Sequence, residues 1–225
     1  MQYFTAYYGL PAAESTVSVL LKQVYHKRRK MPVVLACIST EKEAYLTEGL
    51  PSIKWGKQLL CMLADWFYGV ALSLCTRRGE RGMEAMADSL GKRLGEMCGK
   101  HPGLMACQWA GALCVGERIL LFRRGELCIK LLNTRNHRPY CQELKIGEKE
   151  GSGLEVWSGT IQRGAGILLA TKAFLSAIPA DKMEQCLNVR KIRAQEQCER
   201  RLKELGGCCE PKKTTEMAAL LMIAG

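Results

Sequence analysis

The first third of the chain carries short apolar runs of the kind that form β-strands. Gln2 to Gly9 is rich in Tyr, Phe and Thr, Thr16 to Tyr25 alternates loosely between apolar and polar positions, and Pro32 to Ile38 is continuously apolar. A short, continuous apolar run suits a strand that is buried on both faces. The basic segment from His26 to Lys30 separates the last two runs, so we expect it to form the turn of a hairpin.

Two long helices are predicted next, because apolar residues then recur at helical spacing. From Ser52 to Leu74 these residues lie on one broad face, and the Ser52 side chain can cap the helix. The second helix is predicted over Met83 to Cys98, with a Met-rich stripe that is typical of core packing. Asp181 to Leu205 predicts a third helix, broken near Leu187 and stopped by Gly206-Gly207.

Further strands are expected after the second helix and around the third. The predicted strands are Leu104 to Val115, Arg118 to Phe122, Glu126 to Leu132, Leu154 to Thr160, Gly166 to Thr171 and Met217 to Ala224. Asn133 to Pro139 is predicted to be a polar loop. Strands and helices are segregated rather than alternating, which predicts an α+β fold with two antiparallel sheets and helices on their outer faces.

Length and composition favour one intracellular domain. The chain has 225 residues, 48% of them hydrophobic, and no Gly/Ser/Pro-rich linker divides it, so we expect a single domain over residues 1–225. The first residues lack the features of a signal peptide, and no apolar run is long enough to span a bilayer. Most of the 12 cysteines sit in apolar runs without a C-x-x-C pair, which predicts free thiols, no zinc site and a cytoplasmic location.

A net charge of +11 raises the question of an anionic partner. Basic residues cluster at His26 to Lys30, Arg77-Arg78, Arg123-Arg124 and Arg190 to Lys203. No aromatic residues alternate with them as base-stacking platforms would require, and glutamates are interleaved. A solvated surface is therefore favoured over nucleic-acid binding, which is kept as a second alternative function.

Two early segments resemble motifs of the type 2C (PPM) metal-dependent serine/threonine phosphatases. Ser15-Thr16-Val17 stands before an apolar run, where the family has Asn-Glu/Gln-Asp. The strand through Cys37 continues into Ile38-Ser39-Thr40, where the family has Asp-Gly-Met-Gly-Gly and then a long helix. Each segment keeps the apolar framework of the family motif and changes its functional residues.

Three later segments continue the resemblance in the same order. Gly125-Glu126 is the nearest match to Gly-Asp-Ser-Arg, and Leu168 to Phe174 matches Leu-Leu-x-Thr-Asp-Gly with Lys172 in place of the aspartate. Thr215-Glu216-Met217 stands where the closing family strand begins with Asp-Asn-Ile-Thr. The resemblance implies an αββα sandwich, in which two antiparallel sheets are flanked by helices, and a role in bacterial-type signalling.

In the family, acidic residues of these motifs hold two divalent cations that activate the attacking water. The matching positions here are Val17, Ile38 with its neighbour Ser39, Lys172 and Thr215. None of these side chains is the anionic oxygen ligand that Mg²⁺ or Mn²⁺ requires, and the chain has no Asp-Gly pair. The resemblance therefore implies a pseudophosphatase without a metal cofactor, which acts as a binding or regulatory module for a phosphorylated or other protein.

Two points stay open at this stage. The first is a divergent active phosphatase that uses Mg²⁺ or Mn²⁺ with the nearby Glu14, Glu41 and Glu216. The second is Lys172, which needs a carboxylate, solvent or an outside anion because an isolated buried ammonium is costly. An ion pair with one of these three glutamates is expected, and an anion contact at Lys172 is the sharper alternative.

Overall fold

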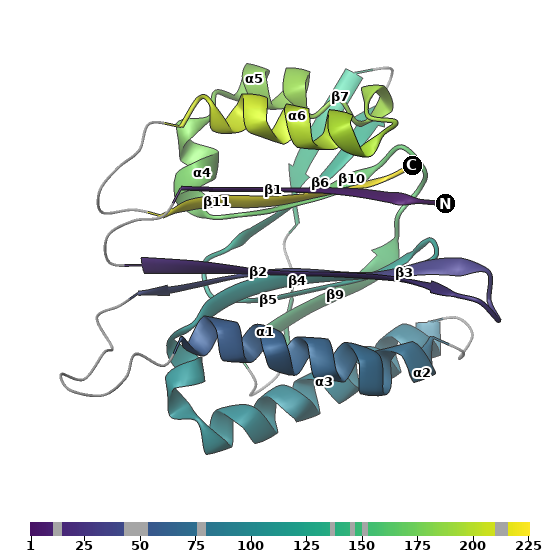
Figure 1. Ribbon diagram of the computed structural model, residues 1–225, viewed down its shortest axis with the longest axis vertical. Coiled ribbons are helices and arrows are strands. Elements are labelled where there is room, and N and C mark those ends of the chain that lie inside the picture. Colours follow the sequence, from purple (N-terminus) through teal and green to yellow (C-terminus); the bar gives the residue numbers. More distant parts are fainter. Residues whose placement is uncertain are drawn as a thin grey trace.

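The computed structural model has two antiparallel sheets that pack face to face, with helices covering both outer faces (Figure 1). This is the α+β, αββα arrangement that the sequence predicts. The residues that the structure describes are 1–10, 15–42, 54–75, 80–135, 138–144, 147–149, 153–209 and 216–225.

One sheet is five-stranded, with the order β1-β11-β10-β6-β7 and antiparallel neighbours throughout. Its strands are β1 (Tyr3–Leu10), β6 (Cys128–Arg135), β7 (Arg138–Glu143), β10 (Gly166–Ala170) and β11 (Met217–Ala224). The first and last strands of the chain are therefore neighbours, and the N- and C-terminal residues lie close together (Figure 1).

The other sheet is six-stranded, with the order β2-β3-β4-β5-β9-β8. Its strands are β2 (Ser15–His26), β3 (Met31–Lys42), β4 (Gln108–Val115), β5 (Arg118–Arg124), β8 (Gly147–Lys149) and β9 (Leu154–Thr160). The hairpin predicted around the basic segment is confirmed, because His26 pairs with Met31 across a tight turn in which Lys30 has a positive φ of 49°.

Each sheet carries its own helical layer (Figure 1). The six-stranded sheet is covered by α1 (Trp55–Trp66), which continues through a π-helical turn η2 (Phe67–Ala71) into α2 (Leu72–Leu74), and by α3 (Glu80–Lys100). A short 3₁₀ helix, η3 (Pro102–Ala106), leads from α3 into β4. The five-stranded sheet is covered by α4 (Lys172–Ala177), α5 (Ala180–Cys186), the 3₁₀ turn η4 (Val189–Lys191) and α6 (Gln195–Gly206).

Alternation along β3 explains why the sequence from Pro32 to Ile38 is continuously apolar. Val34, Ala36 and Ile38 belong to the core between the sheets, whereas Val33, Leu35 and Cys37 pack against the helices. The next strand supplies a close approach, since a Cβ added to Gly111 would lie 2.1 Å from the Phe122 ring and 2.8 Å from Cys37 Sγ. Both faces of the six-stranded sheet are thus filled by side chains at this point.

Several predicted boundaries were wrong. The segment from Leu104 to Ala106 is 3₁₀ helix rather than strand, because the chain leaves α3 through Pro102. The predicted polar loop at Asn133 to Pro139 instead contains the end of β6 and the start of β7, which pair as a hairpin. Ser52, the predicted helix cap, lies outside the described residues.

The C-terminal helical layer also differs in detail. The break predicted near Leu187 is confirmed, since α5 ends at Cys186 and η4 separates it from α6. The short helix α4 was not predicted; it forms because the Thr171 side chain accepts a hydrogen bond from the Phe174 N–H and so acts as an N-cap.

All 12 cysteines are free thiols, and the majority are buried or half-buried as small apolar residues. Among the described helices, none is long and apolar enough to cross a membrane.

Candidate functional site

One end of the sandwich collects the segments that resemble the phosphatase motifs. β2 begins and β3 ends there, with Val17 opposite Thr40. β10 ends and β11 begins there on the other sheet, with Ala170 opposite Ala219. Val17, Ile38 and Ala218 share one apolar cluster between the sheets, so these strand ends face each other. We call this region, from Val17, Ile38–Glu41, Glu126, Thr171, Lys172 and Glu216, the motif end.

Val17 and Ile38 line the interior of the motif end. Ile38 is fully buried in the core between the sheets, and Val17 is half-buried against the same cluster. Both side chains are aliphatic and offer no atom that can coordinate a cation. The two strand positions that face the space between the sheets are therefore apolar.

Ser39 lies on the opposite face of β3 from Ile38. Its hydroxyl is buried and has no hydrogen-bond partner among the described residues. A Cβ added to Gly56 would lie only 2.9 Å from Ser39 Oγ, so Ser39 packs directly beneath the first turn of α1. This position belongs to the contact between sheet and helix rather than to the space between the sheets.

Glu41 holds the start of α1. Its two carboxylate oxygens accept hydrogen bonds from the Trp55 N–H at 3.3 Å and the Gly56 N–H at 3.0 Å. The N-cap residue Lys54 makes no side-chain cap and the first turn of α1 has no acidic residue, so Glu41 supplies the missing acceptor from a distant strand. A carboxylate that the alternative of an active phosphatase would use for a metal is thus engaged by backbone donors.

Lys172 stands at the first position of α4, and its ammonium lies 3.3 Å from a carboxylate oxygen of Glu126. Both side chains are mostly exposed, at 60% for Lys172 and 68% for Glu126. Among the described residues the partner is Glu126 and neither Glu41 nor Glu216, and Lys172 points to solvent rather than into the space between the sheets. Glu126 comes from the Gly125-Glu126 segment, so two of the motif-like segments meet in this pair.

Thr171, directly before Lys172, ties β10, β11 and α4 together. Its hydroxyl accepts hydrogen bonds from the N–H groups of Phe174 and Ala218, both at 3.2 Å, and donates to the Glu216 carbonyl at 3.3 Å. Thr171 is buried, so these bonds satisfy backbone groups that water does not reach. Glu216 thus contacts Thr171 through its backbone carbonyl and not through its carboxylate. Glu14 and Thr215 lie outside the described residues.

A second ion pair lies between the sheets near the motif end. Arg123 on β5 bonds to the Glu155 carboxylate on β9, and donates to the Leu127 carbonyl at 3.2 Å. The two side chains are only 16% and 24% exposed. No local sequence pattern predicts this pair, because Arg123 and Glu155 are far apart in the chain and meet only through strand pairing. Arg123 had been assigned to a solvated basic cluster, and that assignment was wrong.

The donor set does not fit a pair of divalent cations. The aspartates of the sequence are Asp65, Asp88 and Asp181, and each lies on a helix, in α1, α3 and α5. Within the described part of the chain, no three His, Cys, Asp or Glu side chains come close enough to hold a metal ion. Hard cations such as Mg²⁺ and Mn²⁺ need several oxygen ligands, most of them anionic, so the described residues cannot supply the family's two-metal centre.

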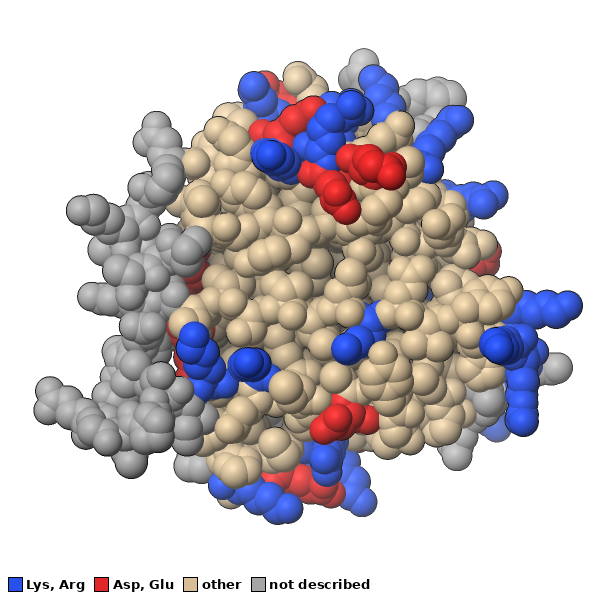
Figure 2. Space-filling view, viewed as in Figure 1, with Lys and Arg blue, Asp and Glu red and all other residues tan. Residues whose placement is uncertain are grey.

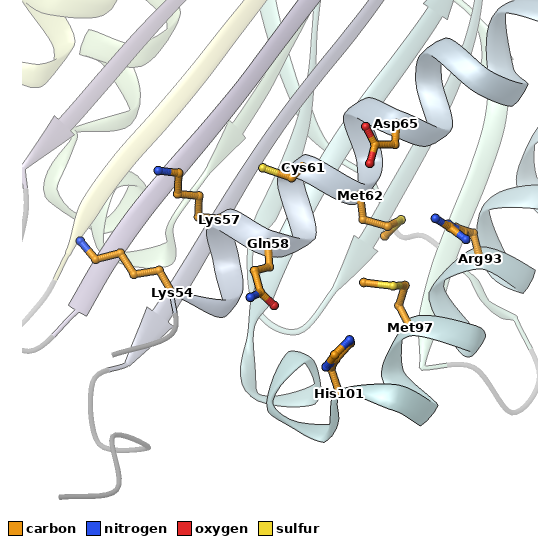
Figure 3. Close-up of a pocket in the computed structure, with 9 residues that line it drawn as sticks. All are labelled: Lys54, Lys57, Gln58, Cys61, Met62, Asp65, Arg93, Met97 and His101. Atoms are coloured by element: carbon orange, nitrogen blue, oxygen red, sulfur yellow. The ribbon is translucent and has the colours of Figure 1, made fainter. Parts of the chain in front are cut away.

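A groove lies elsewhere on the molecule, between α1 and the end of α3 (Figure 3). It encloses about 700 Å³ and is lined by the basic residues Lys54, Lys57, Arg93 and His101, with Met62 and Met97 between them. Among the described residues that line it, Asp65 is the one carboxylate. This groove belongs to the outer helical layer and does not open into the motif end.

Comparison with solved structures identifies the architecture. A serine/threonine phosphatase from S. agalactiae matches with a TM-score of 0.61 at 8% identity, covering 100% of both chains. The chain has the fold of the PPM-type serine/threonine phosphatases. The catalytic domain of the phosphatase PstP, solved with two manganese ions, matches with a TM-score of 0.56 at 11% identity, covering 99% of each chain.

A third match, RsbX in complex with magnesium, has a TM-score of 0.58 at 11% identity and covers 98% of this chain and 94% of that one. No family model and no curated protein matches the sequence. The likeness therefore lies in the backbone arrangement, and it extends over the whole chain.

Proposed function

We propose that this chain is a catalytically inactive, PPM-phosphatase-like module that binds or regulates another protein. The proposal rests on the contacts that the side chains at the motif end make within the chain. Val17 and Ile38 are aliphatic, Glu41 caps α1, and Lys172 pairs with Glu126. Of the positions that match the family's metal motifs, Val17 and Ile38 thus serve packing and Lys172 an ion pair, while the neighbouring Glu41 caps a helix.

The partner would be a protein, and a phosphorylated segment is the form that the basic surface favours. The net charge of +11 attracts anionic partners over long range. Lys172 is the proposed anion contact at the motif end, although its pair with Glu126 already provides a counter-charge. Exposed ion pairs contribute only about 0–1 kcal/mol, so a phosphate group could displace Glu126 from Lys172.

A divergent active phosphatase is the alternative, and the fold favours it because neighbours of the same fold were solved with manganese or magnesium. In that case a bound Mn²⁺ or Mg²⁺ would supply the activated water. The engagement of Glu41 with two backbone N–H groups argues against this reading, since a ligand role would require α1 to give up its cap.

Turnover of a phosphothreonine peptide and of a chromogenic phosphate ester in millimolar Mn²⁺ tests the proposal. We expect no phosphate release above the buffer control. Release that chelation with EDTA abolishes would overturn the proposal in favour of the active alternative. The binding arm compares the phosphopeptide with its unphosphorylated form, and Lys172→Ala with the parent chain. Equal binding by both chains would remove Lys172 as the anion contact.

A further inference from the structure

The outer edge of β2 is a long strand edge without a partner among the described residues. β2 is the first strand in the order of the six-stranded sheet, and β3 pairs with it along all 12 residues on one side only. A strand edge presents a row of unpaired N–H and C=O groups, which makes it a template for pairing with another strand.

The other sheet edges, β1, β7 and β8, have features that normally prevent such pairing: a side chain bonded to the edge backbone, a proline or a short length. On β1, the side chain of Gln195 bonds to both backbone groups of Thr5, accepting from its N–H at 3.1 Å and donating to its carbonyl at 2.6 Å. β7 contains Pro139, which lacks an N–H donor, and β8 has only three residues. β2 is longer than any of these three strands, at 12 residues, and it has no proline.

The side chains along β2 are suited to burial. Its sequence, STVSVLLKQVYH, contains Lys22 as its only lysine and no acidic residue. Leu21 is 41% exposed and Tyr25 is 60% exposed. On the helix side, Tyr68 of η2 is also exposed. The Lys22 ammonium lies over its ring, 5.9 Å from the ring centroid. Figure 2, viewed as Figure 1, shows few charged side chains across the middle of this face, where β1 and β2 run.

We infer that β2 pairs with β2 of a second copy of this chain, antiparallel and about a two-fold axis at Leu21. This register places Leu21 opposite Leu21 of the other copy, and Tyr25 opposite Val17. Lys22 then faces Leu20, so no like charges stand directly opposite each other. Apolar side chains that are exposed in one copy are covered by apolar side chains of the other.

Charge selects the antiparallel arrangement over a parallel one. The basic turn from His26 to Lys30 ends β2, and a parallel pair would bring two such turns together. In the antiparallel pair the two turns lie about 34 Å apart, given about 3.4 Å per residue over the ten positions between them. That separation exceeds the Debye length of about 8 Å at physiological ionic strength, so their repulsion is screened.

Sedimentation velocity from low to high micromolar concentration tests the inference. The parent chain should form a dimer, and Leu21→Lys should raise its dissociation constant at least tenfold, because two lysines then face each other across the axis. Tyr140→Lys is the matched control: Tyr140 is 43% exposed on β7, and its replacement should leave the dimer unchanged. Circular dichroism and thermal melting establish that each variant is folded, and Tyr25→Lys replaces Leu21→Lys if that variant does not fold.

A charge-pairing experiment distinguishes the proposed register from a general effect of surface charge. Leu21→Lys and Leu21→Glu should each be monomeric alone, and their mixture should recover a dimer because opposite charges meet at the axis. A parent chain that stays monomeric at high micromolar concentration overturns the inference. A dimer that is unaffected by either variant, or variants that recover no dimer on mixing, would overturn it as well.

Discussion

Replacing Glu41 by alanine tests whether its carboxylate stabilises the fold. The variant loses the acceptor of the Trp55 and Gly56 N–H groups at the start of α1. Loss of a helix cap costs about 1 kcal/mol, and loss of a negative charge at a helix N-terminus costs about 0.3–1 kcal/mol more. We therefore expect the free energy of unfolding to fall by about 1.3–2 kcal/mol, which corresponds to about 3–8 °C in melting temperature for a chain of this size.

Urea unfolding followed by circular dichroism measures this loss, with and without millimolar Mn²⁺. Glu41→Gln keeps one acceptor oxygen and should lose about half as much stability. Glu84→Ala, on the exposed face of α3, is the control and should stay within about 0.5 kcal/mol of the parent chain. Equal stability of Glu41→Ala and the parent would refute the capping role. Stabilisation of the parent by Mn²⁺ that Glu41→Ala abolishes would show instead that Glu41 is a ligand.

Three further outcomes follow from the core and the strand ends. Thr171→Val should destabilise the chain by about 1–3 kcal/mol in urea unfolding, because the buried Phe174 and Ala218 N–H groups lose their acceptor, whereas Thr171→Ser should retain most of the stability. Gly111→Ala should cost about 1–3 kcal/mol, since its Cβ would meet the Phe122 ring and Cys37 Sγ, and full stability in the same assay would contradict that packing. Burial raises the pKa of the Cys114 and Cys198 thiols from 9.0 to about 12, so unfolding releases their protons and stability should fall as pH rises from about 9 towards 12. A Cys198→Ala variant should show a shallower decline over that range.

The order of the elements could be predicted from sequence because local patterns carry it. The continuous apolar run at β3 and the helical stripes of α1 and α3 are each determined by which faces are buried. Most of β6 was predicted, but β7 and its hairpin with β6 were missed because β7 is mostly polar and is exposed at Tyr140. A mostly polar segment at an exposed sheet edge lacks the apolar pattern that distinguishes a strand from a loop.

The candidate site could be predicted only in part. Val17 and Ile38 lie near strand ends and Lys172 directly follows β10, but the motif-like segments did not predict which way each side chain points. Ser39 faces α1 because it alternates with Ile38 along β3, and Lys172 faces solvent because Thr171 starts a helix there. Contacts such as Glu41 with Gly56 depend on the distance between sheet and helix, which no local pattern contains.

The central claim is that the motif end does not hold a pair of divalent cations. Anomalous diffraction from crystals soaked in millimolar Mn²⁺ tests it directly, since each bound ion would appear as a separate peak. We predict no pair of peaks between the strand ends at Val17, Ile38 and Ala218. Two Mn²⁺ ions about 4 Å apart at that place, the spacing of two-metal phosphatase centres, would contradict the account.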